Sequence, residues 1–294
     1  MNVWLWNALE RRFVEPTEDM SSWSLLAADS WFVEHGRMRA FDRHRARFAD
    51  AAAQVGVGES VTGDFWAAVV GKIPATGEWF PRVDLLEPTS GSERSLAFRL
   101  RPAPERTQEL RVLVPPYCDP RSAPGRKGPD IGLLGSVRSE AREQFDCDEV
   151  LLLSEHGYVI EGATTSLLWW DSGTLCVSDP ELGALPGVTS AMVLDEARAR
   201  SIPVDSRRAR PEELVGHEVW LVNALHGIRR VKEYVDGRDD GVGDQRGRVQ
   251  RTAAGTGGRA DESLGRFKRW RDWAETARVP LTAFGDGEEP SDRQ

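Results

Sequence analysis

The sequence predicts a two-domain protein of mixed α/β class, and three observations lead to this expectation. The chain has 294 residues, of which 40% are hydrophobic, which is enough for one large or two modest domains with buried cores. Short strand-like runs are interleaved with segments of helical periodicity along most of the chain. Residues 116–129 are dense in Pro, Gly, Ser and Arg, a composition that is typical of a linker between domains.

The expected N-terminal domain, residues 1–115, is the smaller one. A His35-Gly36 turn joins two expected strands. Asp42 is placed to cap a helix whose apolar residues recur at helical spacing until Gly56 ends it. The expected elements in order are strands at 3–6, 25–33 and 37–41, helices at 42–55 and 64–70, and strands at 78–86, 95–100 and 110–115.

The expected C-terminal domain, residues 130–285, combines helices with short antiparallel strands in hairpins. Within it, residues 236–262 are mainly Gly, Asp, Arg and Gln and are expected to form a flexible loop, and the tail at 286–294 is expected to be disordered. The expected elements in order are a helix at 131–145, strands at 150–153, 158–160, 167–170 and 174–177, a helix at 188–199, a strand from 203, a short helix at 211–215, a strand at 218–222 and an amphipathic helix at 264–277.

The composition excludes several classes of function. The formal net charge is −9 without a concentrated run of Lys or Arg, so a nucleic-acid-binding protein is not expected. Cys118, Cys147 and Cys176 form no CxxC pair, which argues against a disulfide framework or a zinc site. No apolar run approaches the roughly 20 residues of a membrane helix, and no signal peptide is evident. We therefore expect a cytoplasmic protein that binds neither nucleic acid nor membrane.

Lysine is rare in this chain, which narrows the candidates for amine chemistry. There are four lysines, at positions 72, 127, 232 and 268, against 34 arginines (38 − 4). An ammonium can be converted into a nucleophilic amine that forms a Schiff base, whereas a guanidinium stays protonated. Lys127, in the Gly- and Pro-rich loop 126–130, is therefore a candidate nucleophile, with an ordinary solvated linker lysine as the alternative.

Two further motifs follow Lys127 and suit an anionic cofactor. Glu161 ends an expected strand and is followed by small residues, so its carboxylate can face a cavity rather than solvent. The Leu-Pro-Gly-Val-Thr turn places the backbone amides of Val188 and Thr189 and a hydroxyl at a helix N-terminus, which favours a phosphate. An amine, a carboxylate and a phosphate cradle are the groups that hold pyridoxal 5′-phosphate, although each motif alone also occurs as a surface or helix-start feature.

The order and spacing of seven sequence pieces resemble the class IV aminotransferase family, also called the fold-type IV pyridoxal-phosphate enzymes, over roughly residues 25–235. That family runs from an H-x-x-R-L helix through a lysine, a D-E stretch, G-x-(V/I)-x-E-G, an N-L-F-like strand and L-P-G-(V/I)-T to a strand leading to G-I or P-V. The matching residues here are His44–Phe48, Lys127, Asp148-Glu149, Gly157–Gly162, Ser166–Leu168, Leu185–Thr189 and Val222–Ile228.

This resemblance implies roles for individual residues. Lys127 would form the Schiff base with the cofactor and carry the proton between the substrate Cα and the cofactor C4′. Glu161 would contact the pyridine nitrogen, and the phosphate would be held by an arginine and by the helix N-terminus. The resemblance also implies a homodimer with the cofactor at the domain interface. The residues implied to bind the cofactor are Arg47, Lys127, Glu161, Gly187, Val188, Thr189, Asn223 and Ala224.

Departures from the family pattern bear on the reaction. Branched-chain aminotransferases carry a tyrosine five residues after the lysine, where this chain has Gly132, and a threonine in the late phosphate loop, where it has Ala224. The run Asn223-Ala224-Leu225 instead resembles 4-amino-4-deoxychorismate lyase, which has an asparagine at the position of Asp130. We therefore expect lyase or transaminase action on an amino-acid-like substrate, with that lyase as the most similar specific relative. The alternatives are a branched-chain or D-amino-acid transaminase and a cofactor-less dimeric binding module of the same fold.

Candidates for substrate contacts lie in the expected N-terminal domain. Arg82 or Arg99 would bind a substrate carboxylate, with a surface arginine as the alternative. Trp31 would form a wall of the substrate pocket, although an aromatic residue in a strand usually belongs to the core.

Overall fold

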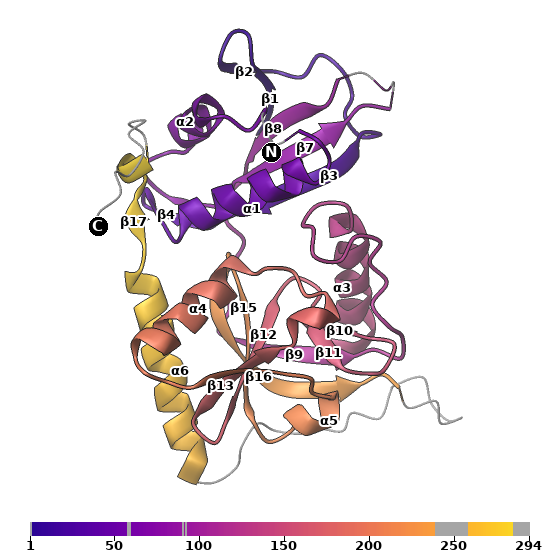
Figure 1. Cartoon of the computed structure of the whole chain (residues 1–294), viewed down its shortest axis with the longest axis vertical. Helices are drawn as coiled ribbons and strands as arrows, with labels where there is room; N and C mark the ends of the chain where they lie inside the picture. The colour runs from indigo at the N-terminus through magenta and orange to yellow at the C-terminus, as the bar shows by residue number, and fades with distance from the viewer. Residues whose placement is uncertain (1, 58–59, 90, 92, 239–257, 285–294) are drawn as a thin grey trace. The chain divides into compact units, whose positions relative to one another are not determined.

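The computed structural model describes residues 2–57, 60–89, 91, 93–238 and 258–284, and the chain divides into two compact units (Figure 1). Unit 1 comprises Met1–Glu105, Lys127–Pro129 and Ala277–Gln294, and unit 2 comprises Arg106–Arg126 and Asp130–Thr276. Each unit combines β-sheet with helices, so the expected mixed α/β class is confirmed.

Unit 1 is built on an antiparallel sheet of five strands in the order β2-β1-β8-β7-β3. Alternating residues of β7 (Arg82–Glu87), Val83 and Leu85, join the hydrophobic core on one face of the sheet. Helices α1 (Phe41–Ala53) and α2 (Gly63–Lys72) bury their apolar faces in the same core. The other strands of this sheet are β1 (Asn2–Asn7), β2 (Arg12–Val14), β3 (Ser24–Ser30) and β8 (Ser95–Leu100).

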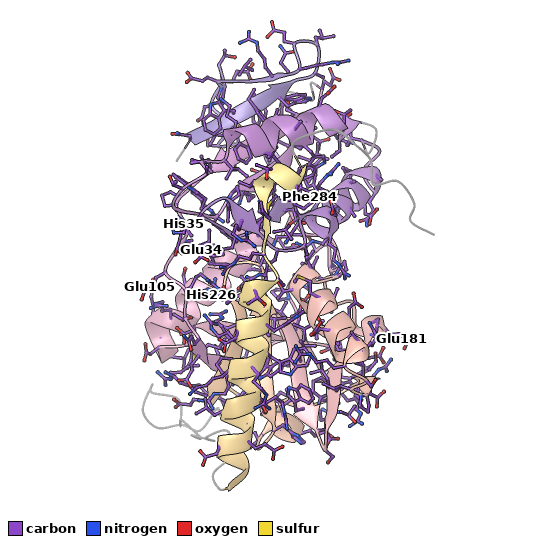
Figure 2. The ribbon with its side chains drawn as sticks, turned by 90° about the vertical axis from the view of Figure 1, so that its left-hand side faces the viewer. Glu34, His35, Glu105, Glu181, His226 and Phe284 are labelled. Atoms are coloured by element: carbon purple, nitrogen blue, oxygen red, sulfur yellow. The ribbon has the colours of Figure 1, made fainter. Side chains whose placement is uncertain are left out.

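A smaller sheet of unit 1, in the order β17-β5-β4-β6, contains the last strand of the chain. β17 (Val279–Pro280) pairs antiparallel with β5 (Arg37–Met38). The short helix η3 (Leu281–Phe284) follows, and Figure 2 labels its last residue, Phe284. Phe284 packs edge to face on Phe41 with 5.2 Å between ring centroids. The other two strands are β4 (Val33–Glu34) and β6 (Glu78–Trp79).

Unit 2 contains a mixed sheet of eight strands in the order β11-β10-β9-β16-β15-β12-β13-β14. β9 is parallel to both of its neighbours, and β13 is parallel to β14, whereas the remaining pairs are antiparallel. The strands are β9 (Glu109–Val114), β10 (Glu149–Leu153), β11 (Val159–Gly162), β12 (Ser166–Asp171), β13 (Thr174–Ser178), β14 (Val204–Arg207), β15 (Glu218–Asn223) and β16 (Gly227–Asp236).

The helices of unit 2 pack on different parts of this sheet (Figure 1). α3 (Ile131–Phe145) buries Val137 and Ala141 against β9, β10 and β16. α4 (Val188–Ala199) and α6 (Gly258–Thr276) share a core with β12, β13 and β15 that is rich in tryptophan. The shorter elements are η2 (Pro180–Leu182) and α5 (Pro211–Leu214). No helix in the described part of the chain is both long and apolar enough to cross a membrane.

The structure differs from the expected organisation at the boundary between the units. The sequence placed the end of the first domain at residue 115, but β9 pairs with β10 and β16 and therefore belongs to unit 2. The linker at 116–129 is divided, because Lys127–Pro129 belong to unit 1 and the preceding residues to unit 2. Residues 277–284, expected in the second domain, also belong to unit 1.

Two local expectations are also corrected. Asp42 does not cap α1: the helix begins at Phe41, and its N-cap is Ala40, which adopts the left-handed conformation with φ 45°. Of the expected flexible loop at 236–262, the last residues from Gly258 belong to α6 and Asp236 ends β16. Residues 239–257 of that loop, and the tail expected to be disordered at 286–294, lie outside the described residues.

Candidate active site

Lys127 is held at the edge of the large sheet of unit 1. Its carbonyl accepts a hydrogen bond of 2.7 Å from the backbone N–H of Ala28 in β3. Gly128 follows with φ +153°, and a Cβ built on it would lie 2.6 Å from the Ala27 Cα. A side chain at position 128 is therefore incompatible with this close approach, and the glycine lets the backbone next to Lys127 dock on β3.

Arg47 lies on α1 in the same unit and is oriented by a buried carboxylate. Its Nε donates to the Oδ2 of Asp29 at 2.8 Å and its Nη2 to Oδ1 at 2.9 Å. His44, one helical turn earlier, places Nδ1 2.7 Å from the same Oδ1. Asp29 is fully buried: burial raises its pKa, but Arg47 and His44 more than offset this and hold the pKa below its usual range.

The positive charge of Lys127 acts on the cluster of Asp29, His44 and Arg47. Burial lowers the pKa of His44, Asp29 opposes that effect, and the positive charges of Arg47 and Lys127 lower it further. Two of the predicted cofactor residues, Arg47 and Lys127, therefore lie in one electrostatic neighbourhood of unit 1. With its pKa lowered, the imidazole of His44 adds no third positive charge there at neutral pH.

Glu161, at the end of β11 in unit 2, is a buried carboxylate with one satisfied oxygen. Its Oε1 accepts from Arg121 Nη1 and from the backbone N–H of Leu185, each at 2.7 Å. Its Oε2 accepts from no residue that the structure describes. Burial raises the pKa of Glu161 to about 7, and the two donors on Oε1 oppose that rise.

The turn at 185–189 sits directly beside Glu161 and opens α4 at Val188. The N-cap, Gly187, provides no side-chain hydrogen bond to the first turn, so an external acceptor can approach the amides there. A Cβ on Gly187 would collide with the Ser166 hydroxyl, so the backbone passes very close to β12. Thr189 is buried in the first turn of a helix of 12 residues, which is the geometry that binds phosphate oxygens.

Asn223 and Ala224 lie in the turn between β15 and β16. Asn223 Nδ2 donates to the Thr164 carbonyl at 3.3 Å, and its Oδ1 accepts from the His226 N–H at 2.8 Å. Ser166, which contacts Gly187, pairs with Val222 at the end of β15. The unit 2 residues predicted to bind the cofactor therefore share one end of the sheet, where β11, β12 and β15 meet the start of α4.

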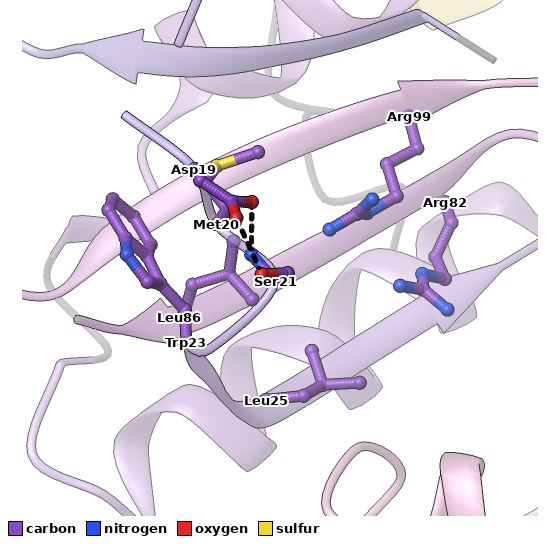
Figure 3. A pocket seen from close by; sticks show the side chains of 8 residues that line it. All are labelled: Asp19, Met20, Ser21, Trp23, Leu25, Arg82, Leu86 and Arg99. Carbon is purple, nitrogen blue, oxygen red and sulfur yellow. Dashed lines mark hydrogen bonds between the residues drawn. The ribbon is translucent and has the colours of Figure 1, made fainter. Parts of the chain in front are cut away.

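Arg82 and Arg99 line a pocket in unit 1 with a volume of about 410 Å³ (Figure 3). They are opposite each other on β7 and β8, and both pair with the buried Asp84, with 2.7 Å between Arg82 Nε and Oδ1. The segment between β2 and β3 supplies Trp23 and other residues to the opposite side of the pocket (Figure 3). The remaining lining residues are Asp19, Met20, Ser21, Leu25 and Leu86.

Trp31 does not line this pocket. It is 1% exposed and packs between Phe41 and Trp66 in the aromatic core of unit 1, with ring centroids 5.0 Å and 6.1 Å away. This burial favours a packing role, and the expectation that Trp31 walls a substrate pocket stays a prediction.

Three residues that were not predicted from sequence as part of the site contact or position residues that were. Asp29 orients Arg47, and Arg121 contacts Glu161. Asp130 accepts from the Ser122 N–H and hydroxyl and from the Ala123 N–H at 2.8–3.0 Å, which closes the loop that carries Lys127. These hydrogen bonds outweigh burial and lower the pKa of Asp130. Within the described ranges, no group of three or more His, Cys, Asp or Glu residues is placed to bind a metal ion.

Comparisons with known proteins identify the family of the chain. The model of the family described as amino-transferase class IV matches residues 27–234, more than half of the chain. A probable branched-chain-amino-acid aminotransferase of Thermotoga maritima is 32% identical over 97 residues, which are 32% of this chain and 36% of that relative. The chain therefore spans little more than a third of that curated relative.

Solved structures extend the similarity of fold to almost the whole chain. A branched-chain aminotransferase of Thermoproteus uzoniensis, crystallised with norvaline, has a TM-score of 0.71 and 18% identity over 96% of this chain and 99% of its own. A 4-amino-4-deoxychorismate lyase, described as putative, of Legionella pneumophila has a TM-score of 0.63 and 16% identity over 83% of this chain and 90% of its own.

Proposed function

Because the chain belongs to the class IV aminotransferase family, we propose that it acts on an amino-acid-like substrate with Lys127 as the covalent anchor of the cofactor. The family is pyridoxal 5′-phosphate-dependent, and this chain is an enzyme of that kind. The observation that carries the proposed residue roles is the state of Glu161. A buried carboxylate that keeps one oxygen without a partner among the described residues suits the protonated nitrogen of a pyridine ring.

Each unit by itself carries groups that suit a part of the cofactor. Lys127 would supply the amine, and the first turn of α4 at Val188 and Thr189, together with Arg47, would bind the phosphate. Glu161 would hold a proton at the ring nitrogen. When bound, the cofactor supplies an electron sink for negative charge that develops at the substrate Cα.

The residues of the chain would then perform three tasks in catalysis. Lys127 would remove and return the proton at the substrate Cα, since a neutral amine can accept that proton and the resulting ammonium can give it back. Asp29 would keep the Arg47 guanidinium oriented, so that the phosphate meets a fixed cation. Asp130 would keep the loop of Lys127 closed through its bonds to Ser122 and Ala123.

Arg82 and Arg99 remain the candidates for binding a substrate carboxylate. Both line the pocket of unit 1, and their shared partner Asp84 neutralises one of the two positive charges. The two arginines and Asp84 together carry a net charge of +1 beside an apolar wall formed by Trp23 and Leu86, and the carboxylate of Asp19 lines the same pocket. This combination suits an anion with an apolar body, such as an amino acid or oxo acid with a carboxylate.

For the reaction itself, we propose elimination of pyruvate from 4-amino-4-deoxychorismate. The Asn223-Ala224-Leu225 run, which resembles that lyase, favours it. Transamination of branched-chain amino acids or of D-amino acids is the second candidate. The 97-residue similarity to a branched-chain-amino-acid aminotransferase favours the branched-chain reaction.

The first experiment tests the cofactor anchor. Purified protein is incubated with pyridoxal 5′-phosphate, desalted, treated with borohydride and mapped by mass spectrometry. We expect a visible absorption band and one reduced adduct, on Lys127. Lys127→Ala should abolish this adduct, and Lys232→Ala, at an exposed position of β16, should retain it. A folded protein without an adduct, or with the adduct on another lysine, would contradict the proposal and favour a cofactor-less binding module.

The second experiment separates the reactions and the assembly. Pyruvate released from 4-amino-4-deoxychorismate without a keto-acid acceptor supports the lyase. Amino-group exchange that requires such an acceptor supports the transaminase, with leucine and D-alanine as the probes of the two alternatives.

We also propose a homodimer in a reducing, cytoplasmic compartment. Light scattering after gel filtration should give about twice the chain mass of 32.7 kDa, and a monomer that retains activity would exclude the dimer as a requirement.

A further inference from the structure

A chain of three charged side chains ends at Glu161. Arg121 Nε and Nη2 form a fork on Asp119, with Nε–Oδ1 and Nη2–Oδ2 distances of 3.0 Å and 2.7 Å. Asp119 is anchored in turn by its N–H, which donates to the Leu153 carbonyl at 2.8 Å, and its Oδ1 accepts from the Arg121 N–H. Only Nη1 of the guanidinium extends to Glu161 Oε1, at 2.7 Å, among the partners that the described residues offer.

Because both side chains are buried, the ion pair between Arg121 and Glu161 strongly affects the charge of Glu161. The side chains of Arg121 and Glu161 are 6% and 5% exposed, so water screens their interaction weakly. Burial raises the pKa of Glu161 to about 7, the Arg121 charge opposes this most strongly, the Leu185 N–H adds to that opposition, and the charge of Asp119 acts in the opposite direction. At neutral pH the carboxylate form of Glu161 therefore depends on Arg121.

The same arrangement occurs a second time at the surface and provides an internal comparison. In Asp236-Gly237-Arg238, the arginine again forks on the aspartate two residues before it, with Nη1 2.7 Å from Glu212 Oε1. There the glutamate is 58% exposed, and a backbone hydrogen bond and Arg238 lower its pKa. The two sites share geometry and differ in burial, so burial is what makes the ionisation of Glu161 conditional.

We propose that Arg121 is a positioning residue that keeps Glu161 ionised and directs Oε2 toward the ring nitrogen of the cofactor. Arg121 occupies Oε1 together with the Leu185 N–H, which leaves Oε2 as the oxygen that can accept a further proton donor. Asp119 sets the direction of Nη1, because a guanidinium fork fixed on one carboxylate has one orientation. A lysine at position 121 would keep the positive charge but could not form a fork on Asp119 and contact Glu161 at the same time. The role assigned to Oε2 rests on the proposed function, whereas the control of the charge of Glu161 does not.

The first arm of the test uses the apoprotein and is independent of the cofactor. Glutamate side chains labelled with ¹³C are titrated by NMR, and the Glu161 signal is assigned as the one lost in Glu161→Gln. Arg121→Met should move the midpoint of Glu161 upward by about one pH unit or more, which is about a tenfold change in its ionisation constant. Arg121→Lys should give an intermediate value, and the matched control Arg238→Met should leave Glu161 unchanged. An Arg121→Met midpoint equal to the wild-type midpoint would overturn the inference.

The second arm measures cofactor affinity at pH 7.5 by absorbance titration. Arg121→Met should weaken pyridoxal 5′-phosphate binding by about tenfold, Arg121→Lys less, and Arg238→Met by less than about twofold. In a Glu161→Gln background, Arg121→Met should cause no further loss, because Arg121 acts through Glu161. An equal further loss in that background would show a general structural role and refute the proposal. If wild-type protein binds no cofactor, the proposed function fails, and the apoprotein titration still decides whether Arg121 controls the charge of Glu161.

Discussion

Gly128→Ala tests the docking of the Lys127 segment on β3. The added Cβ would lie 2.6 Å from the Cα and 2.9 Å from the N of Ala27, and Ala27 is completely buried within the sheet. Because neither backbone can yield without disturbing the other, we expect residues 127–129 to move away from β3. The Ala28 N–H, in a residue that is 1% exposed, then loses its acceptor, the Lys127 carbonyl.

The size of the effect follows from these two consequences. An unpaired buried N–H costs about 1–3 kcal/mol, and a strained or displaced backbone costs about the same again. We therefore expect the free energy of unfolding of the apoprotein to fall by about 2–4 kcal/mol, measured by guanidinium denaturation. If the segment detaches without unfolding the unit, the loss of stability is smaller and the yield of borohydride-trapped cofactor on Lys127 falls instead.

Gly132→Ala is the matched control, because it makes the same substitution near the same loop. Gly132 lies in α3, and a Cβ there meets no atom within 4 Å. Alanine in a helix is favoured over glycine, so this variant should be stabilised by about 0.5–1 kcal/mol and should load cofactor normally. Wild-type stability together with wild-type trapping in Gly128→Ala would refute the account of the docked segment.

Three further predictions follow from burial and charge. Trp31→Ala should lower the free energy of unfolding by about 3–5 kcal/mol, measured by denaturation, because it empties a core site; full stability with altered substrate preference would return Trp31 to the pocket. The folded pKa of Asp29 is depressed, so its stabilising contribution is present above the unfolded value of about 3.9 and is lost as the pH falls below it. Asp29→Asn should reduce the fall of the free energy of unfolding between about pH 4 and 2. The same pH dependence as in the wild type would refute this. In native protein, a thiol reagent should modify the exposed Cys118 and leave Cys147 and Cys176 unmodified. Both of these are buried, and burial raises the pKa of Cys147 to about 12. Rapid modification of two or three thiols in the folded protein would contradict this.

Regular elements with clear local signals were predictable from sequence. The helices expected at 131–145 and 188–199 have the same bounds in the structure, because apolar periodicity is bounded by recognisable signals such as Pro186-Gly187. The N-cap of α1 was not predictable, because Ala40 adopts the left-handed conformation and an alanine carries no sequence signal for that conformation.

The boundary between the units was not predictable from composition. A Pro- and Gly-rich stretch marks a place where the chain turns, but membership of a sheet is decided by pairing. β9 pairs with β10 and with β16, about forty and about one hundred and twenty residues later in the chain, and nothing local in 109–114 indicates those partners. For the same reason β16, the longest strand of unit 2, was recognised only through its opening Gly227-Ile228 motif.

The candidate site shows the same division between local motif and distant contact. Lys127, Glu161 and Thr189 were proposed as site residues because each belongs to a short motif in a family order. Asp29 and Arg121 were missed because their roles depend on partners 18 and 40 residues away in the chain. Asp-x-Arg spacing gives the same fork at 119–121 and 236–238. At 205–207, however, Arg207 contacts Asp205 through Nε and uses Nη1 for Asp171. The spacing alone therefore predicts neither the fork nor the carboxylate that the third nitrogen contacts.

The rarity of lysine also has a chemical consequence at this site. Asp29, Asp84 and Asp119 are buried or nearly so, and each is held by an arginine fork. A guanidinium binds carboxylates and phosphates strongly but does not lose its proton near neutral pH, so it does not compete as a nucleophile. Under the proposed function, arginines would hold the anionic groups of cofactor and substrate, and Lys127 would be the amine that meets the reactive carbonyl. An additional lysine at position 47 or 121 would keep the positive charge but introduce a second amine, and on this argument it would reduce the selectivity of adduct formation.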